Sequence, residues 1–133
     1  MADQERENTV LLVDDDRPIR EGLRRFFDGT SYRVAGEAAD GMAAVALCRK
    51  LRPDLVLLDV KMPLLNGIDA ARLIREERSA RCIVMLTSFD DQSCVEQALA
   101  AGAAGYLTKP LRAEDILPTL ELCLSHTKEY YLL

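Results

Sequence analysis

Five short apolar runs alternate along this chain with longer amphipathic segments, and this order restricts the fold more than any other feature. The run Leu55-Val56-Leu57-Leu58 contains no polar residue, which is typical of a strand covered on both faces. We predict strands over residues 9–13, 32–38, 54–59, 82–87 and 104–108. Strands that alternate with helices favour right-handed crossovers and helices on both sides of a parallel sheet. The sequence therefore predicts an α/β fold of the (βα)5 type, a doubly wound five-stranded parallel sheet.

The segments between the predicted strands have the apolar spacing and the end signals of helices. The first helix is expected to begin near Pro18, with Asp16 as its N-cap residue. Pro118 lies inside the last predicted helix, where it removes a backbone hydrogen bond, so it is expected to bend that helix or to shift its start. The third, fourth and fifth helices are predicted over about residues 67–78, over 90–101 and around Ile116, Leu120 and Cys123.

Composition limits the chain to an ordinary globular domain. Its 133 residues are 49% hydrophobic, enough for one core, and its net charge of -5 argues against binding of a nucleic-acid backbone. No apolar run reaches the roughly 18 residues of a membrane span, and residues 1–8 are charged rather than a signal peptide, so a cytoplasmic location is expected. The cysteines have no C-x-x-C spacing and are predicted to be buried free thiols rather than metal ligands or disulfides. They are Cys48, Cys82, Cys94 and Cys123.

Four of the apolar runs stop at residues that can bind a metal or a phosphate. In an open parallel sheet, ligands bind outside the carboxyl ends of the strands, and the strand order 2-1-3-4-5 places strands one and three side by side. Asp14, Asp15 and Asp59 are therefore expected to meet. Carboxylates that converge in a crevice repel one another, and a bound divalent cation offsets that repulsion. Because the ligands are hard oxygens, the sequence predicts a Mg²⁺ pocket.

Thr87 and Lys109 end two further strands and suggest a chemistry for this pocket. A carboxylate can attack a phosphoryl group and form an aspartyl phosphate if the charge on the transferring oxygens is neutralised. A metal and a lysine can supply that neutralisation. A hydroxyl at the end of strand four can donate a hydrogen bond to the phosphate and so report its presence.

The motifs at these strand ends resemble those of a known family. They are V-D-D-D at 13–16, D-V-K-M-P-L-L-N-G at 59–67, L-T-S at 86–88 and G-Y-L-T-K-P at 105–110. Together they resemble the receiver domain of two-component response regulators, over essentially residues 9–124. The resemblance implies a flavodoxin-like fold, with residues 1–8 as a tail and residues 125–133 as a helix extension, a tail or part of a linker.

The resemblance also assigns roles to individual residues. It implies that Asp59 is the phosphoacceptor and that Asp14 and Asp15 hold Mg²⁺ together with Asp59 and the backbone carbonyl of Lys61. Thr87 would engage the phosphate and Lys109 would pair with the phosphoryl oxygens. Tyr106 would change rotamer with phosphorylation, and the Lys109-Pro110 peptide bond would be cis. Phe89 and Lys61 would flank the path of the attacking water, and Phe89 is expected to slow hydrolysis.

Partners follow from the same resemblance, and other interpretations stay open. A sensor histidine kinase or phosphotransfer protein would donate the phosphoryl group, and the switched domain would control an output domain or a protein partner. A second copy of the chain is a further candidate partner, whereas direct contact with nucleic acid or membrane is not expected. No enzyme activity is expected beyond self-phosphotransfer and self-dephosphorylation.

Two alternative functions remain open for a chain with this pattern. They are a mononucleotide binder of the same topology and a small Mg²⁺-dependent phosphohydrolase. At the residue level, Asp14 and Asp15 could be helix caps and Tyr106 an ordinary sheet aromatic.

Overall fold

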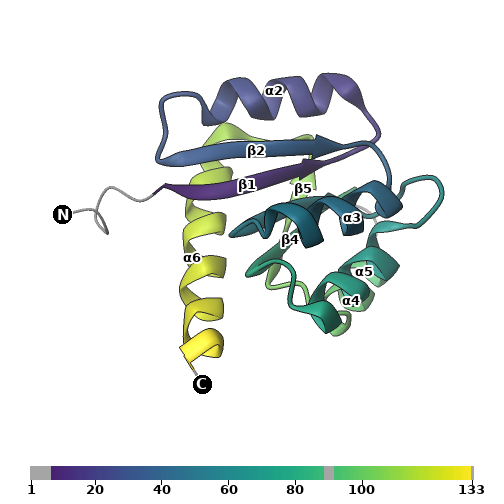
Figure 1. Cartoon of the computed structure of the whole chain (residues 1–133). Helices are drawn as coiled ribbons and strands as arrows, with labels where there is room; N and C mark the ends of the chain where they lie inside the picture. Colours follow the sequence, from purple (N-terminus) through teal and green to yellow (C-terminus); the bar gives the residue numbers. More distant parts are fainter. Residues whose placement is uncertain (1–6, 89–91, 133) are drawn as a thin grey trace.

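The computed structural model describes residues 7–88 and 92–132. It contains one parallel sheet in the order β2-β1-β3-β4-β5, as predicted (Figure 1). The strands are β1 (Asn8–Val13), β2 (Tyr32–Ala38), β3 (Leu55–Asp59), β4 (Cys82–Ser88) and β5 (Gly105–Lys109). The helices are α2 (Arg17–Phe27), α3 (Gly41–Leu51), α4 (Gly67–Glu77), α5 (Gln92–Ala100) and α6 (Ala113–Leu132).

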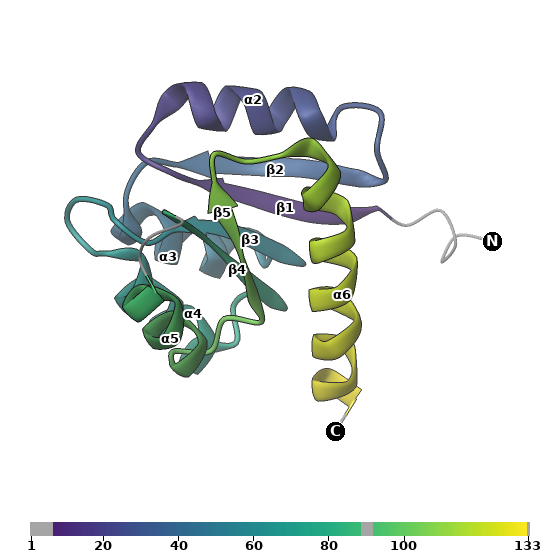
Figure 2. The same cartoon turned by 180° about the vertical axis from the view of Figure 1, so that it is seen from behind.

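Helices cover both faces of the sheet and produce two separate cores. One core lies under α3, α4 and α5, and the other under α2 and α6, on opposite sides of the sheet (Figures 1 and 2). The central strand β3 contributes to both, since Leu57 packs in the α2/α6 core and Leu58 in the other. Residues 55–58 are each 0% exposed, and full burial of one such leucine contributes about 1.5–3 kcal/mol. The lack of polar alternation in this run is thus explained by burial on two faces.

A side chain caps the N-terminus of α3 and of α4, whereas the predicted side-chain cap of α2 does not form. Asp40 accepts a hydrogen bond from the amide of Ala43 at the start of α3, and Asn66 accepts one from Asp69 at the start of α4. Asp16 does occupy the N-cap position of α2, but its side chain makes no cap hydrogen bond. Its backbone carbonyl instead accepts from the amides of Ile19 and Arg20. The position was predicted correctly, whereas capping by the carboxylate was not.

Helix α6 begins at Ala113 and continues through Pro118 to Leu132. The proline therefore does not shift the start of the helix, which is one of the two effects predicted for it. It leaves the carbonyl of Glu114 without the amide donor that a residue four positions later would normally supply. Within the described part of the chain, no helix is long and apolar enough to cross a lipid bilayer.

Candidate functional site

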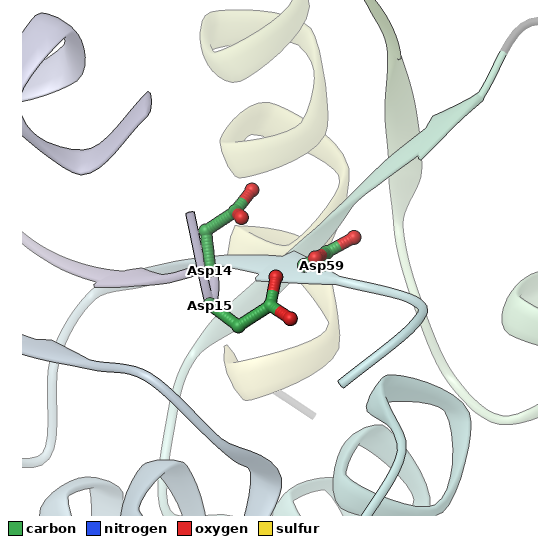
Figure 3. Close-up of side chains that lie close together, drawn as sticks. All are labelled: Asp14, Asp15 and Asp59. Atoms are coloured by element: carbon green, nitrogen blue, oxygen red, sulfur yellow. The ribbon is translucent and has the colours of Figure 1, made fainter. Parts of the chain in front are cut away.

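Three aspartates meet where β1 and β3 end side by side. Asp14 follows the last residue of β1, Asp59 is the last residue of β3, and Val13 pairs with Leu58 in the sheet. One carboxylate oxygen from each of Asp14, Asp15 and Asp59 lies within 4.8 Å of the others (Figure 3). Asp14 is 1% and Asp59 6% exposed, while Asp15 is exposed. The predicted convergence of these carboxylates is confirmed.

The loop that carries Asp14 is fixed by hydrogen bonds from three directions. The amide of Asp14 donates to the carbonyl of Ala38 at the end of β2 over 3.1 Å. One Asp14 carboxylate oxygen accepts from the amide of Asp16 over 2.9 Å. The carbonyl of Asp14 accepts from the Nη1 of Arg20 on α2 over 2.7 Å. The acids therefore lie on a loop that is already held in place without a ligand.

Arg20 is a contributor to this site that the sequence did not reveal. Its Nε donates to Glu37 on β2 over 3.0 Å, and Arg24 donates to the other oxygen of the same carboxylate over 2.7 Å. Burial acts to raise the pKa of Glu37, but hydrogen bonds from Arg24 and Arg20 hold it below its usual value. The guanidinium beside the acids is thus balanced by Glu37. The sequence gave no signal for these contacts of Arg20, because one partner lies in the loop after β1 and the other on β2.

Lys109 reaches the acids from the far end of the sheet. It is the last residue of β5, and its Nζ lies 2.8 Å from Asp14 Oδ2 and 3.4 Å from Asp59 Oδ1. Burial acts to lower the pKa of Lys109, but hydrogen bonding and attraction to these two carboxylates raise it, so the ammonium stays charged. The Lys109-Pro110 peptide bond is cis, as predicted.

Asp59 has an unfavourable environment for a charged carboxylate. Burial, followed by repulsion from Asp14, raises its pKa from 3.8 to about 6, although Lys109 acts in the opposite direction. One lysine therefore does not compensate for three converging acids. Since carboxylate oxygens are ligands that Mg²⁺ prefers, the donor set formed by Asp14, Asp15 and Asp59 fits that ion.

A small hollow of about 130 Å³ lies beside Asp59. It is lined by Asp59, Val60, Lys61, Thr87, Ser88 and Lys109. Thr87 is 3% exposed, and among the described residues its hydroxyl donates one long hydrogen bond, 3.4 Å to the carbonyl of Ser88. An acid, a hydroxyl and an ammonium thus surround a space suited to a group of phosphoryl size and charge.

Tyr106 does not belong to this hollow. Tyr106 on β5 is 44% exposed and borders a different surface hollow with Thr108 and Arg112. Its position therefore agrees with an outward-facing aromatic, and it does not line the hollow beside Asp59. Phe89, predicted to slow hydrolysis, lies outside the described residues.

Gly67 is a further site residue, and the sequence did not reveal why a glycine is needed at this position. A Cβ at this position would lie 1.9 Å from the backbone oxygen of Asp59. The Gly67 amide also donates to the carbonyl of Val60 over 2.7 Å. The loop after β3 is therefore folded back tightly against the phosphoacceptor candidate, and a side chain at position 67 would not fit.

Comparisons with known proteins agree with this arrangement. The family model of the response regulator receiver domain matches residues 10–121. The transcriptional regulatory protein PdtaR of Mycobacterium tuberculosis is 44% identical over 120 residues, which cover 90% of this chain and 58% of PdtaR. Protein CcdB of Bacillus subtilis is 38% identical over 88% of this chain and 98% of its own length. The chain thus spans little more than half of PdtaR.

Solved structures give the same result. The receiver domain of the response regulator NarL from Mycobacterium tuberculosis superposes with a TM-score of 0.83 at 33% identity, covering 90% of this chain and 97% of that one. Chemotaxis protein CheY4 of Vibrio cholerae gives 0.80 at 33% identity, covering 88% and 98%. On the family match, the relatives and the fold together, this chain belongs to the receiver domains of two-component response regulators.

Proposed function

We propose that this domain, spanning residues 9–124, accepts a phosphoryl group on Asp59 from a sensor histidine kinase or phosphotransfer protein. The observation that carries the proposal is the hollow beside Asp59, which Thr87 and Lys109 also line. An Asp59 carboxylate oxygen forms a bond to phosphorus as the bond between phosphorus and the donor nitrogen breaks. The negative charge of the transferring oxygens must then be neutralised.

Charge neutralisation falls to Lys109 and to the metal site. Lys109 already lies 3.4 Å from Asp59 Oδ1, so a small movement brings its ammonium to a phosphoryl oxygen. Asp14, Asp15 and Asp59, with the backbone carbonyl of Lys61, would hold Mg²⁺, which neutralises charge on the transferring oxygens. Thr87 would donate its hydroxyl to the phosphate, since its hydrogen bond to the carbonyl of Ser88 is long and weak.

The phosphorylated domain then acts as a switch. Thr87 moves toward the phosphate, Tyr106 changes rotamer, and the altered surface controls an output domain or a protein partner, among which a second copy of the chain is included. Tyr106 is exposed on β5, where a change of rotamer alters a surface that a partner can contact. The soluble setting expected for such a relay is the cytoplasm, and the only reactions of the domain are its own phosphorylation and dephosphorylation.

The test is phosphorylation by a small phosphodonor with Mg²⁺, followed by intact-protein mass spectrometry. Wild type is expected to gain a single adduct of about 80 Da, the mass of one phosphoryl group. Asp59→Asn preserves the shape of the side chain but removes the nucleophile, so the adduct should be lost. Asp16→Asn is the matched control, because Asp16 belongs to the same acidic run but its side chain makes no cap hydrogen bond.

Persistent phosphate in Asp59→Asn at the wild-type level would refute the assignment of Asp59. Steady release of inorganic phosphate from many phosphate esters, without a stable adduct, would favour the phosphohydrolase alternative. A mononucleotide binder would show neither result but would retain a nucleotide.

A further inference from the structure

Leu64 has a backbone conformation that leucine rarely adopts. Its φ of 69° lies in the left-handed region, and it is the central residue of a tight turn in which the amide of Leu65 donates to the carbonyl of Pro63 over 2.8 Å. The other described non-glycine residues with positive φ are Arg52 and Arg78, which are the C-caps of α3 and α4. Leu64 ends no helix, and a glycine would adopt this conformation without steric cost.

Burial in the core does not explain the leucine either. Leu64 is 78% exposed, the highest value among the large hydrophobic side chains that the structure describes. Leu122 and Met42 follow at 61% and 60%, but both lie on helices, where their backbone is unstrained. An apolar side chain in water on a strained backbone is unfavourable on both counts. Strained residues of this kind concentrate at functional sites, so Leu64 calls for a functional explanation.

The loop that carries Leu64 is closed at its base and held by a neighbouring helix. The amide of Gly67 donates to the carbonyl of Val60 over 2.7 Å, which joins the two ends of the loop. A Cβ on Gly41, the first residue of α3, would lie 1.9 Å from the carbonyl oxygen of Leu65, so this helix begins in contact with the loop. Leu64 is therefore presented to solvent by a turn that is supported on both sides.

This loop begins at the hollow beside Asp59. Asp59, Val60 and Lys61 line the hollow, and the loop projects past the carboxyl ends of the strands (Figure 1). Leu64 is three residues from Lys61, so their Cα atoms are at most about 11 Å apart. A standard protein interface covers about 800 Å² on each partner, equivalent to a disc of roughly 16 Å radius. A protein that covers the hollow therefore extends to Leu64, whereas a small phosphodonor does not need to reach it.

We propose that Leu64 is a docking contact for the protein that donates the phosphoryl group to Asp59. The proposal rests on phosphoryl acceptance by Asp59 and adds a contact by which the domain recognises its protein donor. The donor is expected to present an apolar surface opposite Leu64, and Met42, which follows Gly41 at the start of α3, extends the apolar surface on this side. Burial of the leucine against the donor offsets the cost that the free domain carries. Leu64 positions the donor and does not touch the phosphoryl group.

The experiment compares two phosphodonors with wild type, Leu64→Gly and Leu64→Met. One donor is acetyl phosphate, and the other is the sensor histidine kinase that transfers fastest to wild type among the purified kinases of the source organism. Leu64→Gly should slow transfer from the kinase about tenfold, because the burial of one leucine is lost, and should not change the rate with acetyl phosphate. Leu64→Met keeps an apolar side chain and should retain most of the kinase rate. Leu64→Gly should melt at or above the temperature of wild type, because the strain is removed.

Leu122→Ala is the matched control, since Leu122 is also an exposed leucine but lies on α6, and it should change neither rate. A wild-type rate of transfer from the kinase to Leu64→Gly would overturn the proposal. An equal loss with both donors would also overturn it, because the substitution would then have changed the site itself. If wild type accepts from acetyl phosphate but from no kinase, the docking contact is refuted while Asp59 stays the acceptor. If neither donor phosphorylates wild type, the proposed function is refuted, and the docking contact with it.

Discussion

Asp59 is the residue at which the function we propose and the stability of the fold conflict most directly. Asp59 is 6% exposed, its carboxylate shares its surroundings with those of Asp14 and Asp15, and it pairs with Lys109. A residue selected at this position only for the stability of the fold would have an uncharged side chain. The charge is retained at a cost to the folded state, and the cost falls when Asp59 binds a proton or a cation.

This cost predicts a pH dependence in metal-free solution. The pKa of Asp59 rises from 3.8 in the unfolded chain to about 6 in the folded protein, so the folded protein binds the proton more tightly. The contribution of Asp59 to stability is therefore greatest below pH 4 and is lost as the pH rises through 6. By linkage, this pKa difference lowers the free energy of unfolding by at most about 3 kcal/mol.

Urea unfolding in the presence of a chelator gives the free energy of unfolding of wild type and of Asp59→Asn. The difference between these two free energies measures the contribution of the Asp59 charge. That difference should grow between pH 4 and pH 6 in favour of Asp59→Asn and then stay level. A difference that is constant over this range would show that Asp59 titrates normally.

At the scale of elements, the site depends on how tightly its loops are folded against the strand ends. The loop after β3 returns so closely that a Cβ at position 67 would collide with the backbone of Asp59, and the loop after β1 is held by Arg20 from α2. Neither residue lines the hollow beside Asp59. Both nevertheless determine where the acids lie.

Gly67→Ala should therefore damage both stability and site. The added carbon would lie 1.9 Å from the Asp59 carbonyl, so the loop must move, at a cost of about 1–3 kcal/mol and with slower phosphorylation. Gly22→Ala is the matched control, because no atom lies within 4 Å of its added carbon. In the middle of α2 that change should instead stabilise the protein by about 0.5–1 kcal/mol. Equal effects of the two substitutions in thermal melts would contradict this account.

Arg20→Gln tests the other loop. Because Glu37 balances the charge of Arg20, loss of positioning should outweigh loss of charge, and Mg²⁺ affinity should fall about tenfold. Arg24→Gln is the matched control, since Arg24 bonds the same Glu37 but makes no hydrogen bond to Asp14. Titration calorimetry with MgCl₂ compares the two. Unchanged affinity in Arg20→Gln would show that the loop keeps its shape without the arginine.

Much of this arrangement could be predicted, and the exceptions share a cause. The ends of all five strands lie within one residue of the prediction, because apolar runs and strand-end acids are local signals. The contact of Arg20 with Glu37 and the close approach of Gly67 to Asp59 could not be predicted, because each joins segments that the sequence pattern does not connect. The missing side-chain cap at Asp16 is a separate, local exception. Its neighbourhood is organised by Asp14, whose carboxylate takes the amide of Asp16.

For the whole molecule, metal binding and folding should be linked. The acids converge only in the folded sheet, so Mg²⁺ should bind the native state preferentially. A concentration 100-fold above the dissociation constant should add about 2.7 kcal/mol to stability, and removal by chelation should reverse it.

Asp15→Ala should bind Mg²⁺ at least about tenfold more weakly and so lose much of this stabilisation. Without metal it should melt at or above the temperature of wild type, because one of three repelling carboxylates is gone. Asp16→Ala should behave as wild type in both conditions. Melting curves of Asp15→Ala that respond to Mg²⁺ as wild type does would exclude Asp15 as a ligand.

The ion pair between Asp14 and Lys109 joins the loop after β1, the first strand in the chain, to β5, the last. During synthesis on the ribosome, the acids emerge early and the lysine late. A nascent chain that lacks β5 has the acids without their cation, so the phosphoryl-accepting centre we propose is incomplete until nearly the whole domain has been made. Partly made chains would then not compete with finished molecules for the phosphodonor, and only fully synthesised domains would accept the phosphoryl group.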